Sequence, residues 1–154
     1  MSIASNTEPS AFLANYLPYL LHRADSLISQ PFHAELTSLG LQMSEWRVLA
    51  VLDRRGPSPI GLLTDETMLP QPTVTHAVAR LEERCDVTRI RSDHDRRQRI
   101  VALTDAGVAK VMTLITRAHE HETAVLDAVS MHDASGELRR LLTELIRRLE
   151  ASSG

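Results

Sequence analysis

Two neighbouring segments decide the fold: QPTVTHAVARLEER at residues 71–84 and VTRIRSDHDRRQRIVALT at residues 87–104. The first predicts a helix that begins at Pro70, because proline is tolerated at the first helical position. On one side of this helix no acidic residue occurs before Glu82. On the other side, apolar residues recur at helical spacing and form a face for burial: Val74, Ala77, Val78 and Leu81.

The polar side of this helix has the chemistry needed to read a base-pair edge. Arginine can donate two hydrogen bonds to guanine, and threonine offers a hydroxyl group together with a methyl group that suits thymine. An ordinary surface helix with polar residues outward is the alternative interpretation. We expect four residues to make groove contacts: Thr73, Thr75, His76 and Arg80.

The second segment predicts a β-hairpin, with one strand from Val87 to Arg91 and the return strand from Gln98 to Leu103. Five arginines fall within eleven residues of it: Arg89, Arg91, Arg96, Arg97 and Arg99. A groove-reading helix followed at once by such a hairpin is typical of a winged helix-turn-helix, whose helix and wing contact neighbouring grooves of one duplex. A solvated turn that serves solubility alone is the alternative for the hairpin tip.

Three segments resemble the MarR family of bacterial transcription regulators. DRRQRIVALTDAG at residues 95–107 looks like the family's wing, QPTVTHAVARLE at 71–82 like its recognition helix, and GLQMSEWRVLAVL at 40–52 like its second helix. The resemblance implies a dimeric repressor or activator of a pseudo-palindromic operator in double-stranded DNA. The half-sites would lie about one helical turn, ~34 Å, apart.

The resemblance also assigns roles within the wing. It places Arg97, and with it Arg96, in the minor groove. Asp95 is expected to accept hydrogen bonds from Arg97 or its neighbour, which orders a flexible cation before DNA arrives. Arg91 and Arg99, at the strand ends, are expected to contact phosphates.

The remaining chain predicts helices around this centre. We expect a flexible arm at residues 1–10, then a single domain at 11–154, mostly α with a small β-hairpin. In it, 44–104 form the winged helix-turn-helix and the helices of 11–40 and 105–151 form a dimerisation region. Packing of the terminal helices within a monomer is the alternative.

Several helix boundaries follow from local sequence signals. Gly40 is expected to stop the first helical region and Pro31 to kink or end a helix within it. Ser44 and Ser58 are predicted N-caps, the latter followed by Pro59 at the first helical position. Thr104 caps a long helix to about Val129, and residues 132–136 break it before the final helix.

Charge and composition limit the function classes. The 154-residue chain has a formal net charge of −3, so bulk charge does not favour coating of nucleic acid. Residues 71–104 nevertheless contain seven basic and five acidic side chains, whereas residues 1–70 and residues 105–154 each contain more acidic than basic side chains. A single cysteine fits a reducing cytoplasm, and we expect neither a signal peptide nor a membrane span.

No residue pattern supports an enzyme, a cofactor or a metal site. His119-Glu120-His121-Glu122 lacks the second histidine of HExxH in either register, because Thr123 and Val125 occupy the required positions. Gly56 and Gly61 have phosphate-loop spacing, yet Leu62-Leu63 replace the lysine and hydroxyl residue. Surface histidines are the favoured interpretation. A regulatory metal site is the alternative, drawing on His22, His33, His119 and His121.

The chain departs from the MarR pattern at Cys85 and Asp86. The family usually has a glycine, suited to a left-handed helix stop, and then an apolar residue that packs under the wing. Cysteine in that conformation has a steric cost, and the aspartate must remain solvated or find a partner. An inert Cys85 is favoured over a thiol sensor. These departures also support an alternative function, a winged-helix protein-interaction module that has lost operator binding.

The resemblance further implies an effector site between the dimerisation helices and the winged region, for a small aromatic or anionic molecule. An effector acts only if it binds one spacing of the recognition helices better than another. Six aromatic, histidine or basic residues form the candidate pocket, with core packing as their alternative role: Tyr16, Tyr19, His22, Arg23, Trp46 and Arg47.

Overall fold

The structure is a computed structural model that describes residues 11–91 and 99–153. Its helices and strands are α1 (Ala11–Asn15), α2 (Leu17–Ser38), α3 (Met43–Arg55), β1 (Ser58–Pro59), α4 (Ile60–Thr67), α5 (Gln71–Glu83), β2 (Val87–Arg91), β3 (Arg99–Leu103), α6 (Asp105–Ala128) and α7 (His132–Ser152). The predicted fold class, mostly α with a small hairpin, is confirmed. Residues 1–10, predicted as a flexible arm, lie outside the described residues.

The chain separates into two compact units, one of residues 1–31 and 122–154 and the other of residues 32–121. We call the first the terminal unit and the second the winged unit. α2 and α6 each contribute residues to both units. The assignment of 11–154 to a single domain stays a prediction.

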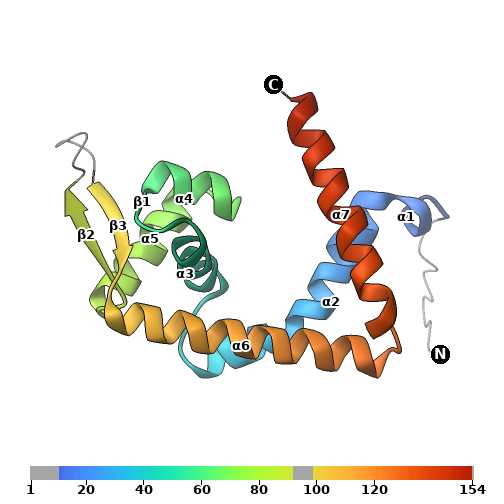
Figure 1. Ribbon diagram of the computed structural model, residues 1–154, viewed down its shortest axis with the longest axis horizontal. Helices are drawn as coiled ribbons and strands as arrows, with labels where there is room; N and C mark the ends of the chain where they lie inside the picture. Colours follow the sequence, from blue (N-terminus) through green and yellow to red (C-terminus); the bar gives the residue numbers. More distant parts are fainter. Residues whose placement is uncertain (1–10, 92–98, 154) are drawn as a thin grey trace, which may run out of the picture. The chain divides into compact units, whose positions relative to one another are not determined.

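The winged unit contains a three-stranded antiparallel sheet in the order β1-β3-β2 beside α3, α4 and α5 (Figure 1). In the hairpin Val87 pairs with Leu103 and Arg91 with Arg99. β1 was not predicted: Ser58 and Pro59 pair with Val101 and Ile100 of β3. The prediction that Ser58 caps a helix was therefore wrong; its hydroxyl donates to the Gly56 carbonyl, and α4 begins after Pro59.

The core of the winged unit is aliphatic and joins helices to the sheet. It includes the four predicted apolar residues of α5, together with residues of α3, β2, β3 and α6. Phe32 is buried and packs against the Trp46 ring in a T-shaped arrangement, with centroids 5.2 Å apart and ring planes at 78°. The core residues that are at most 1% exposed are Leu36, Val48, Leu49, Leu63, Val74, Ala77, Val78, Leu81, Val101 and Val111.

Helix boundaries in the winged unit follow backbone geometry. Gly40 ends α2 at a φ of 69°, with the Leu41 N–H bonded to the Leu36 carbonyl and the Gly40 N–H to the Thr37 carbonyl, the Schellman arrangement. The Thr104 hydroxyl accepts the Gly107 N–H at 3.0 Å and caps α6, as predicted. Ser44 lies inside α3, whose N-cap is Gln42, so that prediction was wrong.

α2 continues through Pro31 to Ser38, so of the two outcomes expected at this proline, a kink or an end of the helix, the end does not occur. The predicted break at residues 132–136 was wrong. The long helix α6 stops at Ala128 and α7 begins at His132; the break is only three residues long, with Ser130 in a left-handed conformation. α5 begins at Gln71, one residue after the predicted Pro70, which is its N-cap.

Cys85 and Asp86 join α5 to the wing. Cys85 has a φ of 61°, the left-handed conformation that usually selects glycine, and its N–H bonds to the Glu82 carbonyl. Asp86 is buried, and its carboxylate is paired with Lys110 of α6. The Asp86 carbonyl accepts the Thr104 N–H at 3.0 Å. The buried aspartate has therefore found a partner.

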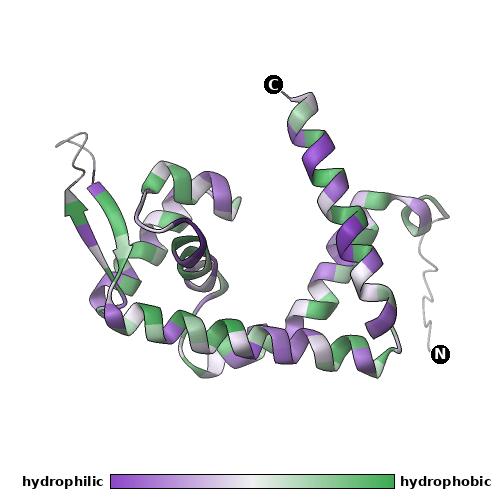
Figure 2. Ribbon diagram, in the orientation of Figure 1, coloured by the Kyte–Doolittle hydropathy of each residue, from purple (hydrophilic) through white to green (hydrophobic). Residues whose placement is uncertain are grey.

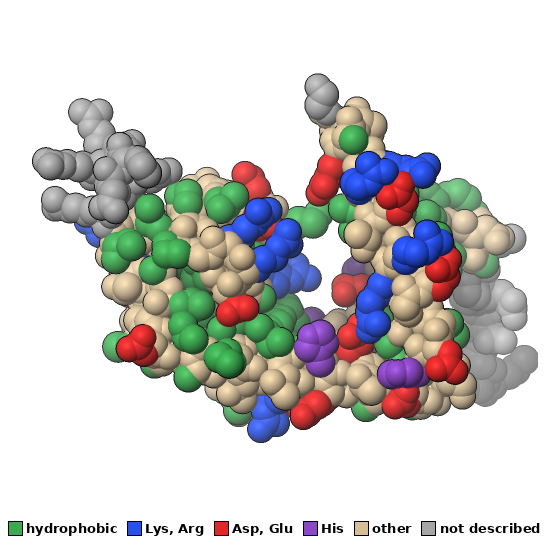
Figure 3. Space-filling model, viewed as in Figure 1, with side chains coloured by type: hydrophobic (Ala, Val, Ile, Leu, Met, Phe, Trp, Pro, Cys, Tyr) green, Lys and Arg blue, Asp and Glu red, His purple; other side chains and the backbone are tan. Residues whose placement is uncertain are grey.

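Hydrophobic and hydrophilic residues alternate along α7 of the terminal unit (Figure 2), and several of the apolar side chains are exposed. Arg140 donates to Glu137, and both Arg147 and Arg148 donate to Glu144. Basic and acidic side chains accordingly lie side by side along this helix (Figure 3). The exposed apolar residues of α7 are Leu138, Leu141, Ile146 and Leu149.

Replacing Gly107 with alanine should destabilise the winged unit. A Cβ at this position would lie 1.9 Å from the Asp86 carbonyl oxygen, so the joint between wing and α6 must shift. We expect the free energy of unfolding in urea to fall by about 2 kcal/mol. Gly61→Ala is the matched control in the first turn of α4, where a Cβ meets nothing within 4 Å. An equal effect of the two variants would contradict the prediction.

The decrease in the free energy of unfolding at low pH should depend in part on Glu35. A hydrogen bond with His121, aided by the positive charge of Arg117, lowers the pKa of Glu35 below 4.5. Its stabilisation is therefore complete above the pKa of the unfolded chain and is lost as pH falls through the lower pKa of the folded state. Urea unfolding from about pH 7 to about pH 3 should show a smaller loss of stability for Glu35→Gln than for the unmodified protein. Parallel curves would refute this assignment.

Candidate nucleic-acid interface

The outer face of α5 is polar and exposed. Thr73, Thr75 and His76 are exposed, whereas Val74, Ala77, Val78 and Leu81 bury the opposite face. Met68, in the turn before α5, has a left-handed φ of 55° and is almost fully exposed. α4, this turn and α5 thus make the helix-turn-helix. Three of the four predicted groove residues are on the surface, with Arg80 partly covered.

Arg80 is partly covered because it forms an ion pair with a buried acid that the sequence interpretation missed. Its Nε lies 3.3 Å from Oε1 of Glu45, a residue of α3 with no solvent exposure. Arg84, one turn further along, places Nη1 3.1 Å from the same oxygen. Glu45 also accepts the Gln42 N–H at 2.6 Å. A signal was present: Glu45 begins the helical series that continues with Val48, Leu49 and Leu52.

The strands of the wing, β2 and β3, place arginines next to α5. Arg99 is exposed at the start of β3, directly across from Arg91 at the end of β2. Arg89 Nε is 3.2 Å from Glu82 Oε2 of α5, an ion pair without hydrogen-bond alignment. The predicted tip residues Asp95, Arg96 and Arg97 and the side chain of Arg91 lie outside the described residues.

The six residues of the predicted effector pocket divide between the units. Tyr16, Tyr19, His22 and Arg23 belong to the terminal unit, where Tyr16 stacks on Phe12 with centroids 4.9 Å apart. Trp46 and Arg47 are half-buried on α3 of the winged unit. Their grouping into one pocket stays a prediction.

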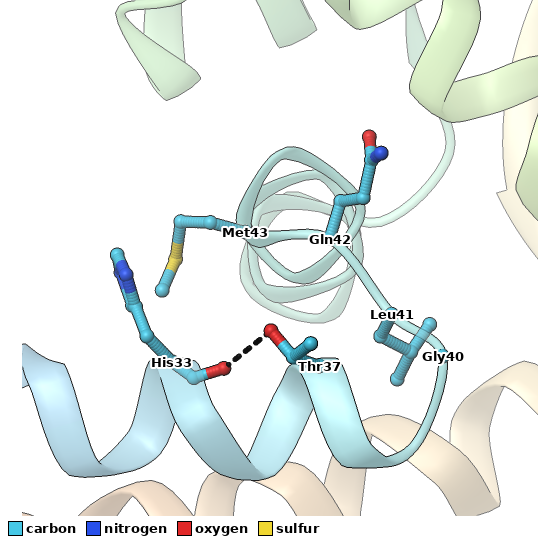
Figure 4. A pocket seen from close by; sticks show the side chains of 6 residues that line it. All are labelled: His33, Thr37, Gly40, Leu41, Gln42 and Met43. Carbon is cyan, nitrogen blue, oxygen red and sulfur yellow. Dashed lines mark hydrogen bonds between the residues drawn. The ribbon is translucent and has the colours of Figure 1, made fainter.

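A hollow of about 410 Å³ lies instead within the winged unit, between the end of α2 and the start of α3 (Figure 4). Met43 turns toward His33, while Gln42 points the other way, and the Thr37 hydroxyl donates to the His33 carbonyl at 3.0 Å. The lining residues are His33, Thr37, Gly40, Leu41, Gln42 and Met43.

A second hollow, of about 420 Å³, lies beside α6 and has Arg84 and Lys110 among its lining residues. Both cations already face buried acids, Glu45 and Asp86. Among residues 11–91 and 99–153, no three histidine, cysteine or acidic side chains group as metal ligands would. No helix in those ranges is long and apolar enough to cross a membrane.

Comparison with known proteins identifies the family. The MarR family profile matches residues 39–98. The crystal structure of the MarR family transcriptional regulator SPO1453 from Silicibacter pomeroyi DSS-3 is 36% identical, covers 87% of this chain and 98% of its own, and has a TM-score of 0.71. The chain belongs to the MarR family of transcription regulators. Because members of the MarR family are transcription regulators and not enzymes, the prediction of a non-enzymatic protein is confirmed.

Two more distant proteins complete the comparison. The HTH-type transcriptional regulator MhqR of Bacillus subtilis (strain 168) is 25% identical over 84% of this chain and 86% of its own length. The crystal structure of CouR from Rhodococcus jostii RHA1 bound to p-coumaroyl-CoA is 20% identical, with a TM-score of 0.73 over 88% of this chain and 95% of that one. The likeness to CouR shows that the two chains share the MarR fold.

Proposed function

We propose that this MarR-family regulator binds a specific sequence of double-stranded DNA and acts in the cytoplasm as a repressor. The observation that carries the proposal is the outer face of α5, which exposes Thr73, Thr75 and His76. No acidic side chain occurs in α5 before Glu82, so phosphates are not repelled near these groups. Hydroxyl and imidazole groups can hydrogen-bond to base edges in the major groove.

The wing supplies the second contact in this proposal. Arg91 and Arg99, paired at the tip end of the hairpin strands, would contact phosphates. Asp95 would hold Arg97, with Arg96 beside it, for insertion into the minor groove. Residues 71–104 have seven basic and five acidic side chains, although the net charge of the chain is −3. Phosphates would therefore be attracted to this segment and not to the chain as a whole.

We further propose a homodimer formed through the terminal unit. Leu138, Leu141, Ile146 and Leu149 expose large apolar side chains on one helix, and Phe12, Leu17 and Leu27 do so on α1 and α2. Burial of such side chains in a two-fold interface removes them from water. The two recognition helices would then meet half-sites of a pseudo-palindromic operator about one helical turn, ~34 Å, apart.

A small aromatic or anionic effector would modulate this binding. The hollow beside α3 has a volume suited to a small ligand, and His33 and Thr37 offer polar groups to it. A relative with the same fold, CouR, is named as bound to p-coumaroyl-CoA, which has an aromatic acyl group and anionic phosphates. The effector would act by binding one arrangement of the dimer more tightly than another.

Specific DNA binding is tested with the promoter DNA beside the protein's own gene and with sequences selected from a random pool. Arg97→Ala should weaken operator binding by about tenfold or more, because one base contact contributes ~1–3 kcal/mol, while the dimer remains intact. Arg148→Ala on α7 is the matched control, since it removes one exposed arginine outside the winged unit.

Two results would contradict this assignment. Unchanged affinity of Arg97→Ala would remove the wing from the interface. The absence of any competitor-resistant complex with the unmodified protein would favour the protein-interaction module.

The dimer is tested by placing amides in the exposed apolar row of α7. Leu141→Gln combined with Leu149→Gln should shift the sedimentation mass from dimer to monomer at micromolar concentration. Both leucines are more than half exposed in the single chain, so their replacement should leave helix content unchanged. Arg140→Gln, on the same helix, is the control. A dimer that persists in the double variant would move the interface away from α7.

A further inference from the structure

Glu45 is an acid without solvent contact, and its carboxylate is compensated from two elements. The Gln42 N–H bonds to one oxygen at the start of α3, and Arg80 and Arg84 of the α5 segment share the other. A buried ion loses its hydration, so it is stable only when partners replace the lost water. Any movement of Arg80 away from Glu45 therefore has a free-energy cost.

Arg80 meets this carboxylate with one edge of its guanidinium group only. The contact uses Nε, at 3.3 Å, and leaves the terminal nitrogens without a protein partner among the described residues. The side chain remains 43% exposed. Thr73, His76 and Arg80 follow one another at helical spacings of three and four residues, so Arg80 continues the exposed row of α5. Its free edge is a fork of the kind that pairs with guanine or phosphate.

Arg84 explains why the acid is needed at this place. It lies one turn after Arg80, and like charges at that spacing repel each other. Glu45 lies between them with a single negative charge, and Arg84 is also fixed by donating to the Gly40 carbonyl at 2.6 Å. Without the negative charge, Arg80 would lose its ion pair and would be repelled by the uncompensated positive charge of Arg84.

We propose that Glu45 is a positioning residue that fixes Arg80 in the orientation needed to read one base pair. The inference rests on the proposed function, because it assumes that α5 enters a groove. A pre-ordered arginine loses less conformational entropy on binding than a free one. The benefit applies only where the fork has a matching base, so Glu45 contributes to specificity more than to general affinity for DNA.

Glu45→Gln tests the proposal, since glutamine has the same size and keeps an acceptor for the Gln42 N–H. We expect operator affinity to fall roughly tenfold, the loss expected from releasing one ordered side chain. Affinity for random duplex should stay unchanged or rise, because the variant has one negative charge fewer. The preference for the operator sequence should weaken at one base pair only, the base pair at which Arg80→Ala also loses its preference. Glu66→Gln is the control, at an acid of α4 that pairs with Arg55 of α3, and it should change neither affinity.

A double-mutant cycle separates positioning from a structural role. In an Arg80→Ala background, Glu45→Gln should change operator affinity by less than about twofold. An equal loss in both backgrounds, or a proportional loss for random duplex, would overturn the proposal. If the unmodified protein has no operator preference, the DNA-binding proposal fails and this inference fails with it. If the protein does bind its operator, but Glu45→Gln and Arg80→Ala lower the affinity additively, only this inference is refuted.

If Glu45→Gln does not fold, Arg80→Lys tests the same proposal. Arg80→Lys keeps the charge, but one ammonium group cannot contact Glu45 and a base edge together as the two edges of guanidinium can. Discrimination at the Arg80 base pair should fall nearly to the level of Arg80→Ala. Retained discrimination would overturn the proposal.

Discussion

Asp86 connects α5, the wing and α6. Its N–H closes α5 at the Leu81 carbonyl, its own carbonyl accepts the Thr104 N–H where the wing returns, and its carboxylate is paired with Lys110. Gly107 passes so close to that carbonyl that a side chain has no room. The end of the recognition helix, both ends of the hairpin and the start of α6 are thus tied to one residue. An apolar residue at position 86 would keep the backbone bonds but lose the pair with α6.

The two buried acids of the winged unit, Asp86 and Glu45, stabilise different parts of it. Asp86 fixes the base of the wing, whereas Glu45 links the start of α3 to Arg80 and Arg84. Neither is a typical core residue, because burying a charge is favourable only with close partners. The partners of both acids are partly exposed cations, so each ion pair extends from the core to the outside of the winged unit. The unit therefore combines an aliphatic core with two buried acids whose ion pairs connect α3 to the α5 segment and the base of the wing to α6.

The sequence predicted the elements whose signal is local and missed those that depend on distant pairing. The apolar series of α5 and the two short strands of the arginine-rich hairpin lie within single segments, so both elements were found. β1 is two residues long and exists only because Ser58 and Pro59 meet β3 about forty positions later. Pro31 was expected to kink or end a helix, yet α2 does not end there. Glu45 was missed because an acid in an apolar series looks like a solvent-facing residue until its partners on another helix are known. The wing tip and effector residues stay predictions.

Cys85 is the one cysteine of the chain, and it is exposed at the stop between α5 and β2. A thiol-directed fluorophore would consequently attach at a single position, without any engineering of the sequence. That position is one residue from Asp86 and from Arg84, between the recognition helix and the wing. Emission from such a label would report on the surroundings of this junction in the otherwise unmodified chain.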